Sequence, residues 1–116
     1  MKKPTKAALT VDPSWADAPW GTVEAFVHMY NYAAPESWPA VELVTFERAV
    51  KIKEYLAIFP PQKFWETVYR NAVKSKFLSE TYGYASMDWL LQKGHKDQVH
   101  NCLKTFEGKY NGPTQK

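Results

Sequence analysis

The chain has 116 residues, of which 45% are hydrophobic and 23% are charged, and its formal net charge is +3. This length predicts one domain that can bury a core without metals or disulfides, and a single cysteine, Cys102, excludes an internal disulfide. No apolar run is long enough to span a bilayer, and Asp12, Trp15 and Asp17 stand where a signal peptide would be apolar. We therefore expect a cytoplasmic protein without membrane contact.

The start of the chain predicts an irregular arm followed by a first helix. Residues 1–21 contain three prolines and two tryptophans, which predicts an irregular arm that Trp15 and Trp20 hold against the body. Thr22 is a preferred N-cap residue and begins a helix expected over residues 22–32. Its apolar side chains fall on one face: Val23, Phe26, Val27 and Tyr30.

Two longer helices are predicted on either side of a Pro-Pro break. Thr45 caps the first, over residues 45–59, and Pro60 and Pro61 end it. Pro61 suits the first turn of the second helix, which should continue to Lys74 or Lys76. The apolar face of this second helix is expected to comprise Phe64, Trp65, Val68, Tyr69, Ala72 and Val73.

The last third of the chain predicts two short helices. Ser86 caps the first, which should bury Trp89 and its neighbours before Gly94 stops it in a left-handed conformation. The second is expected over residues 97–107, because Val99, Cys102, Leu103 and Phe106 form one apolar stripe. Gly108 should end this helix, with Tyr110 folding back on it.

The predicted fold class is therefore all-α. We expect a single small domain of about five short helices over residues 22–110, an N-terminal arm over residues 1–21 and a C-terminal tail over residues 111–116.

The charges are unevenly divided along the chain. Residues 7–44 hold five acids and no Lys or Arg, whereas residues 45–110 hold eleven bases against seven acids. Lys63, Arg70 and Lys74 share one side of the predicted helix after Pro61, so three cations would project together toward phosphates. The acidic front could meet a basic partner protein or shield the basic half.

Aromatic residues follow these cations in the sequence. Lys76, Tyr82 and Tyr84 are expected in a loop beyond the helix, and the mixture of cations and rings is typical of single-stranded DNA binding. Arg48 and Lys51, one turn apart on the preceding helix, could extend the basic strip.

Ordinary structural roles compete with each of these interpretations. A helix face with Lys, Arg and Glu66 is the usual solvated face of a domain, and Tyr82 and Tyr84 could fold onto the core. Trp38, Trp65 and Trp89 are expected in the core, because indole rings bury a large area.

The sequence contains no recognisable catalytic or metal-binding motif. His95, His100 and Cys102 have the residue types of a zinc site, but their spacing is not a ligand spacing and no fourth ligand is evident. There is no phosphate-binding glycine loop and no nucleophile motif. We expect a protein that is not an enzyme and that uses no metal and no cofactor.

Two blocks carry a family resemblance, Met87-Asp88-Trp89-Leu90-Leu91 and Phe106-Glu107-Gly108-Lys109-Tyr110. They resemble the end of the C-terminal domain of bacteriophage replication initiator, or replisome organiser, proteins, and the resemblance covers roughly residues 22–110. Those proteins usually carry an N-terminal winged-helix domain that reads DNA, whereas only about twenty residues precede the resemblance here. The stretch 92–100 also looks longer than its counterpart.

The resemblance implies a non-enzymatic accessory protein of phage or mobile-element DNA replication. Such a protein would bind single-stranded DNA, a replicative helicase or another replisome protein. The alternative is a phage-encoded inhibitor of a host nucleic-acid enzyme, such as an anti-CRISPR or other anti-defence protein, whose partner would be a host nuclease or a ribonucleoprotein complex.

Overall fold

The all-α prediction is confirmed in the computed structural model, which describes residues 9–110. Its α-helices over that range are α1 (Val23–Ala33), α2 (Phe46–Ile58), α3 (Gln62–Lys74), α4 (Met87–Leu90) and α5 (Asn101–Phe106). A 3-10 helix, η2 (Pro13–Asp17), and a π-helical turn, η3 (Phe77–Thr81), complete the helical elements. A strand β1 (Leu9–Thr10) pairs antiparallel with β2 (Leu43–Val44), with Leu9 opposite Val44.

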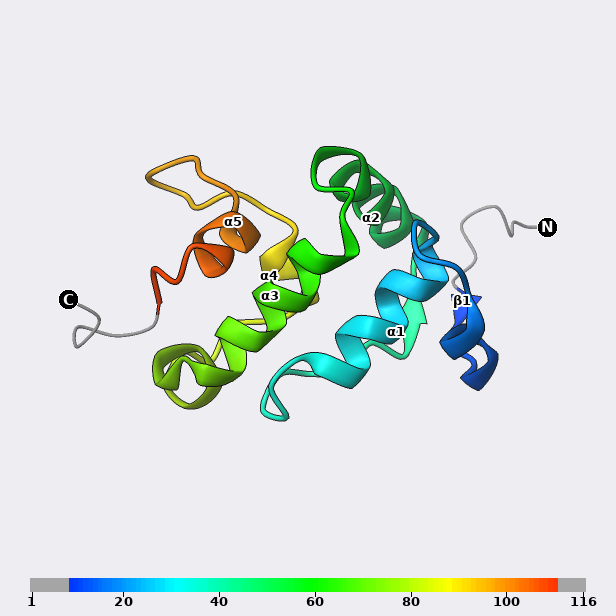
Figure 1. The fold of residues 1–116 in the computed structure, drawn as a ribbon, viewed down its shortest axis with the longest axis horizontal. Helices are drawn as coiled ribbons and strands as arrows, with labels where there is room; N and C mark the ends of the chain where they lie inside the picture. The colour runs from blue at the N-terminus through cyan, green and yellow to red at the C-terminus, as the bar shows by residue number, and fades with distance from the viewer. Residues whose placement is uncertain (1–8, 111–116) are drawn as a thin grey trace.

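Helix α3 lies at the centre of the fold. It packs against α1 on one flank and against α5 on the other, and α2 packs against α1 (Figure 1). The α1 side and the α5 side of α3 therefore belong to different parts of the molecule.

Local capping explains where three of the helices begin. The side-chain oxygens of Thr22, Thr45 and Ser86 each accept a hydrogen bond from the backbone N–H three residues later, all at 3.1 Å. Each bond satisfies a donor that the first helical turn leaves free. The three predicted caps are confirmed.

Trp65 of α3 is the largest fully buried side chain among residues 9–110. Its ring meets Phe26 of α1 edge to face at a centroid distance of 4.8 Å, and its Nε1 donates a hydrogen bond to the Phe59 carbonyl at 2.9 Å. The indole thus combines apolar burial with a satisfied donor, and it joins α1, α3 and the end of α2.

The N-terminal arm was expected to be irregular, but it contains regular secondary structure. Within the described residues it forms β1 and η2, and η2 packs against α1. Trp20 Nε1 donates to the Pro60 carbonyl at 2.8 Å, so the expected attachment of the arm by Trp20 is confirmed. Residues 1–8 of the arm and the predicted tail at 111–116 lie outside the described residues.

The predicted last helix is wrong at its start. Helix α5 begins at Asn101, and residues 93–100 form a turn closed by a bridge between Lys93 and His100. Gln98 has a φ of 58°, a left-handed conformation that a continuous helix excludes, and the Asp97 carboxylate accepts from the Val99 N–H at 3.1 Å. This side-chain hydrogen bond favours a turn over a helix.

The two glycines predicted to stop helices behave differently. Gly108 has a φ of 79° and follows α5, as expected. Gly94 does not adopt the left-handed conformation, and α4 already ends at Leu90.

Two expected core positions are wrong or only partly right. Val73 on α3 is 53% exposed and Phe106 on α5 is 37% exposed. Phe106 nevertheless stacks on Phe64, with centroids 4.6 Å apart. Val73 stands at the edge of its apolar stripe, and Phe106 is the last residue of α5.

The C-terminal end of the described chain returns to the end of α3. The Ser75 hydroxyl donates a hydrogen bond to the Tyr110 carbonyl, and the same oxygen accepts from Leu78 N–H at 3.1 Å. This double contact of a fully buried Ser75 holds η3 and Tyr110 together.

No helix in the described part of the chain has the length and apolar content needed to cross a membrane.

Candidate nucleic-acid interface

The three cations predicted on α3 share one exposed side of that helix. Lys63, Arg70 and Lys74 are all exposed, and none of them forms an ion pair with another described residue. Glu66 lies one turn from Lys63 and from Arg70 without pairing with either. We call this side of α3 the basic face, and its cations are free to contact a ligand.

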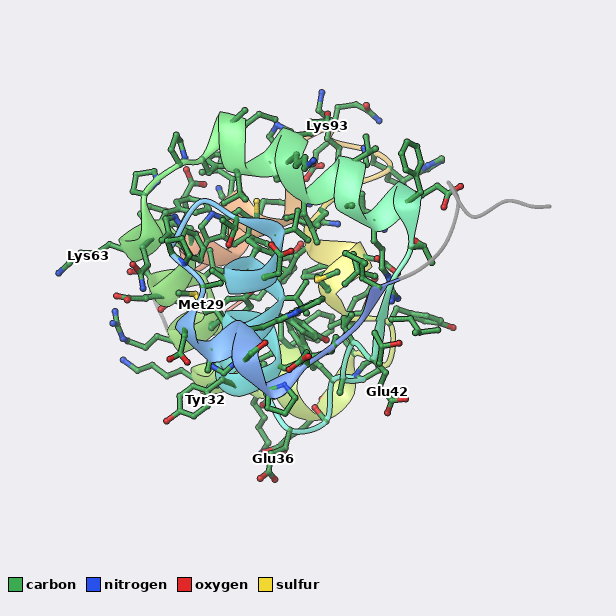
Figure 2. All side chains as sticks on the ribbon, turned by 90° about the vertical axis from the view of Figure 1, so that its right-hand side faces the viewer. Met29, Tyr32, Glu36, Glu42, Lys63 and Lys93 are labelled. Atoms are coloured by element: carbon green, nitrogen blue, oxygen red, sulfur yellow. The ribbon has the colours of Figure 1, made fainter. Side chains whose placement is uncertain are left out.

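An apolar groove of about 470 Å³ runs between α1 and α3 beside the basic face. Arg70 and Lys74 form one rim, and Tyr32, which is 85% exposed, lies on the α1 side. The full lining is Met29, Tyr32, Ala33, Glu66, Tyr69, Arg70, Val73 and Lys74. Figure 2 shows Lys63, Met29 and Tyr32 along one side of the molecule and Glu42 on the opposite side.

Tyr69 forms part of this groove without adding charge to it. Its ring is buried, and its hydroxyl has no hydrogen-bond partner among the described residues. Burial raises the pKa of Tyr69 well above its ordinary value, so the phenol stays neutral. The charge of the groove therefore comes from Arg70, Lys74 and Glu66 at its edges.

Acidic residues border the α1–α3 groove beyond Tyr32. A neighbouring hollow is lined by Glu36 and Glu80 and shares Tyr32 and Val73 with the groove. Because carboxylates repel phosphates, we expect a nucleic-acid strand to follow the basic face and to stop short of this hollow.

The predicted loop aromatics lie away from the α1–α3 groove. Lys76 directly follows the buried Ser75 and is exposed, whereas Tyr82 is half-buried against Phe77, with stacked centroids 5.2 Å apart. Tyr84 is 79% exposed, and its ring meets the Tyr82 ring edge to face. The structure therefore does not bring Tyr82 and Tyr84 to Lys63, Arg70 and Lys74.

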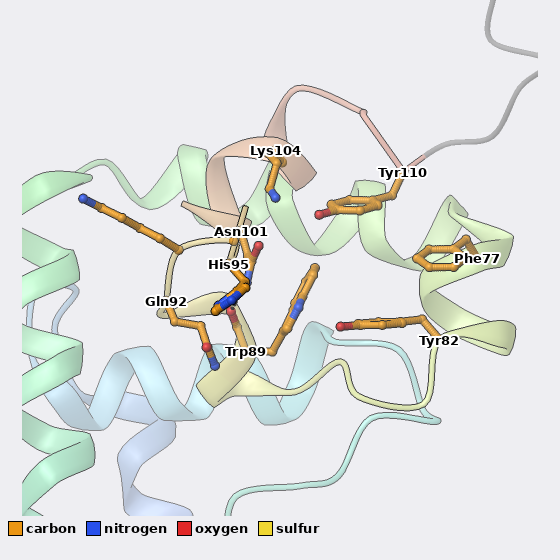
Figure 3. Close-up of a pocket in the computed structure, with 10 residues that line it drawn as sticks. Phe77, Tyr82, Trp89, Gln92, His95, Asn101, Lys104 and Tyr110 are labelled. Carbon is orange, nitrogen blue, oxygen red and sulfur yellow. Dashed lines mark hydrogen bonds between the residues drawn. The ribbon is translucent and has the colours of Figure 1, made fainter. Parts of the chain in front are cut away.

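Tyr82 instead lines a second hollow of about 390 Å³, which we call the aromatic cleft. Its lining residues are Phe77, Tyr82, Trp89, Gln92, Lys93, Gly94, His95, Asn101, Lys104 and Tyr110 (Figure 3). Trp89 lies 5.6 Å from both Tyr82 and Tyr110, measured between ring centroids. Trp89 is half-buried and forms a wall of the cleft, which corrects its predicted place in the core.

Polar groups form the other wall of the aromatic cleft. Lys104 Nζ is 2.9 Å from an Asp97 carboxylate oxygen and 5.9 Å from the Tyr110 ring centroid. Hydrogen bonds from Val99 N–H and from Lys104 lower the pKa of Asp97. A Cβ on Gly94 would overlap Asp97 Oδ1 and would lie 2.6 Å from Lys104 Nζ, so glycine permits this ion pair to approach the backbone.

The two cations of α2 are engaged elsewhere. Arg48 Nε and Nη2 donate to the two carboxylate oxygens of Asp88 at 3.1 and 2.9 Å, and Nη1 donates to the Leu43 carbonyl at 2.9 Å. Lys51 Nζ is 3.5 Å from a Glu54 carboxylate oxygen. Arg48 therefore joins α2 to α4, and the expected extension of the basic strip onto α2 is not formed.

The structure places His95 in the aromatic cleft, His100 beside Tyr55 and Cys102 in the core. His100 Nδ1 is 2.7 Å from the Tyr55 hydroxyl, and Cys102 is fully buried, which raises the pKa of its thiol to about 12. Among residues 9–110, no three His, Cys, Asp or Glu side chains are grouped closely enough to hold a metal.

His100 predicts a pH dependence of stability. Burial, reinforced by the charge of Lys93, lowers the pKa of His100 from its ordinary value of 6.5. Since the fold favours the neutral ring, this stabilisation is complete above the unfolded-state pKa and is lost as the pH falls through the folded-state pKa. We expect the free energy of unfolding, measured by denaturant titration, to fall between about pH 7 and pH 5.

A His100→Asn variant provides the comparison for this prediction. It should be less stable at neutral pH and should lose less of its remaining stability on acidification. An identical pH dependence in both proteins would show that other groups are responsible.

Comparison with protein-family models, with curated proteins and with solved structures finds no match for this chain. The geometry of the described residues is therefore the basis for a functional proposal.

Several residues of these surfaces were not predicted as site residues. Tyr32 falls outside the apolar face predicted for the first helix. A large aromatic ring at such a position is the signal that could have identified Tyr32 as a surface binding residue. Trp89 and Tyr110 belong to the family-like blocks, but the sequence predicts Trp89 in the core and Tyr110 folded back on the last helix. Lys93 and Lys104 are remote in sequence from Tyr82, and only the fold brings them to the same cleft.

Proposed function

We propose that this protein binds single-stranded DNA along the basic face of α3 and acts as a non-enzymatic accessory in phage or mobile-element DNA replication. The observation that carries the proposal is the exposure of Lys63, Arg70 and Lys74 on one helix face without ion-pair partners among the described residues. The replication context comes from the resemblance of the two C-terminal blocks.

The spacing of the cations suits an extended phosphate backbone. Lys74 lies eleven positions after Lys63, which at the helical rise corresponds to about 17 Å along α3. Lysine and arginine at separate turns can each contact a different phosphate, while Arg70 can donate two parallel hydrogen bonds. Lys76, exposed just beyond the end of α3, can add a further contact.

The α1–α3 groove supplies the second requirement, a surface for bases. Single-stranded DNA is bound where cations follow the backbone and bases stack on aromatic rings. Tyr32 is exposed on the opposite rim from Arg70 and Lys74, with Met29 and Val73 between them in the groove lining. In this proposal Tyr32 takes the stacking role first expected of Tyr82 and Tyr84.

The proposal predicts a specific salt dependence. If the basic face neutralises three or four phosphates, the logarithm of the affinity should fall against the logarithm of salt concentration with a slope of roughly −2 to −3, because each contact contributes about −0.7. Fluorescence anisotropy of a labelled oligonucleotide at several salt concentrations measures this slope. Binding that is absent at micromolar protein and low salt would reject the proposal.

Tyr32→Ala tests the base-stacking part within the same assay. Its affinity should fall about fivefold or more with an unchanged slope, since stacking on one ring is worth roughly 1 to 3 kcal/mol. Tyr84→Ala is the matched control, because Tyr84 is similarly exposed but lies away from the groove. Equal losses in both variants would argue against a role for the α1–α3 groove.

The second candidate function is inhibition of a host nucleic-acid enzyme by protein binding. The apolar lining of the α1–α3 groove favours it, because exposed Tyr32 and Val73 with charged rims resemble a protein-binding surface. Affinity purification from the natural host separates the two functions. Recovery of a nuclease or ribonucleoprotein through a Tyr32-dependent contact, with no DNA binding, would select inhibition.

A further inference from the structure

The aromatic cleft has the shape and chemistry of a small-ligand site separate from the basic face. Its volume of about 390 Å³ lies within the range of roughly 300 to 1,000 Å³ typical of small-molecule pockets. It shares no lining residue with the α1–α3 groove.

Aromatic rings form one side of the cleft in an arrangement that leaves ring surface for a flat ligand. Phe77 stacks on Tyr82 at 5.2 Å and on Tyr110 at 6.0 Å, with interplanar angles of 22° and 12°. Trp89 is inclined to Tyr82 and Tyr110 by about 60° and lies beside both (Figure 3). Inclined rings cannot cover one another fully, so a planar ligand can stack against them.

Asn101 places an unused hydrogen-bond acceptor in this cleft. Asn101 is only 4% exposed. Its Nδ2 donates a hydrogen bond to the Trp89 carbonyl at 2.9 Å, which fixes the orientation of the side-chain amide. Its Oδ1 accepts no hydrogen bond from any described residue. This oxygen keeps some exposure within the cleft, so a ligand N–H can reach it and donate to it.

Two lysines line the same cleft, and one of them is paired with Asp97. Lys93, His95 and Lys104 are in its lining, and Lys104 uses one of its three donors on Asp97. Figure 3 shows Lys104, His95 and Asn101 on one side of Trp89 and Tyr82 and Phe77 on the other. A ligand anion attached to a flat ring system would meet this cationic side.

We infer that the aromatic cleft binds an adenine nucleotide. The base stacks against Trp89 and Tyr82, its exocyclic amino group donates to Asn101 Oδ1, and its phosphate contacts Lys93 and Lys104. Asparagine is well suited to adenine because its amide can accept from the amino group and donate to the adjacent ring nitrogen. This site does not depend on DNA binding by α3, and its ligand can be a free nucleotide or the end of a strand.

Titration of the protein with AMP, followed by two-dimensional amide NMR, tests the site. We expect saturable shifts at the Trp89 indole N–H, at the Asn101 side-chain amide and at His95, with none along the basic face. Purine riboside monophosphate, which lacks the amino group, should bind up to about tenfold more weakly, since one hydrogen bond to the Asn101 side chain is lost. Inorganic phosphate alone should not shift the Trp89 indole.

Variants separate stacking from a general effect on the fold. Tyr82→Ala should weaken AMP binding about tenfold through loss of a stacking surface, whereas Tyr84→Ala should bind as wild type. Amide spectra of both variants show whether the fold is retained. If Tyr82→Ala does not fold, Lys93→Glu, at an exposed position, should weaken AMP binding while leaving adenosine binding unchanged.

The source of the nucleotide is distinguished with the Arg70→Glu, Lys74→Glu protein, in which the basic face is removed. A short oligonucleotide ending in an adenosine phosphate that shifts the Trp89 indole identifies a strand end, and shifts from AMP alone identify a free nucleotide. No shift at Trp89, His95 or Asn101 with millimolar AMP and with the oligonucleotide would overturn the inference. Failure of single-stranded DNA to contact α3 would leave AMP binding unaffected.

Discussion

Replacement of Trp65 by alanine is expected to lower the free energy of unfolding by about 3 to 5 kcal/mol, the range for truncating a buried Trp. Trp65 is fully buried, contacts Phe26 at 4.8 Å and satisfies its indole N–H on the Phe59 carbonyl. Because small domains are stable by only about 5 to 15 kcal/mol, this loss would remove a large share of the stability of the fold. Denaturant titration, monitored by circular dichroism, measures this change in the free energy of unfolding.

Val73→Ala is the matched control on the same helix. Val73 is 53% exposed, so its truncation should change the free energy of unfolding by no more than about 0.5 kcal/mol. If Trp65→Ala yields no folded protein, Trp65→Phe should fold with reduced stability, because it retains a ring but not the N–H. A Trp65→Ala protein as stable as Val73→Ala would contradict the described core.

Reversal of two charges on the basic face is expected to have the largest effect on DNA binding. Arg70→Glu combined with Lys74→Glu should weaken single-stranded DNA binding by at least about a hundredfold, because each of the two lost charge-assisted contacts is worth about 1.5 kcal/mol or more. The salt slope should flatten by about 1.4, which corresponds to two phosphate contacts. Both side chains are exposed, so the fold should be retained.

Lys51→Glu combined with Lys53→Glu provides a control with the same change in net charge. Both residues are exposed on α2, and Lys51 is near Glu54. If binding depends on the basic face, this control should retain most of the affinity and the salt slope. Equal losses in the two double variants would indicate a general charge effect and would remove α3 from the proposed mechanism.

Helix positions could be predicted where the determinants are local. Thr22, Thr45 and Ser86 cap helices through hydrogen bonds three residues away, and Pro60 and Pro61 prevent the preceding helix from continuing. Such effects depend on neighbouring residues alone. The same applies to the shared face of Lys63, Arg70 and Lys74, which follows from the helical period.

The turn at residues 93–100 could not be predicted from apolar spacing. Its conformation depends on the Asp97 contact with Lys104, seven residues away, and on the left-handed Gln98. The apolar stripe from Val99 onward is compatible with an earlier helix start, so the spacing alone favoured the wrong boundary. Tertiary contacts decided between the two conformations.

The separation of the site into two surfaces also depends on long-range contacts. Lys76 and Tyr82 are close to Lys74 in sequence, but η3 turns the chain toward Tyr110, which Ser75 holds by a hydrogen bond. Tyr82 therefore packs with Phe77 and Trp89. Tyr32 comes to the basic face from α1, a pairing that no spacing within the sequence indicates.

Amide NMR mapping with an oligothymidylate strand tests the central claim most directly, because it locates the contact without altering the protein. Binding along the basic face predicts shifts at the exposed positions of α3 from Lys63 to Lys74 and at Tyr32, with Arg48 and Lys51 unchanged. Shifts confined to α2, or no shifts at saturating strand concentration and low salt, would contradict single-stranded DNA binding by α3.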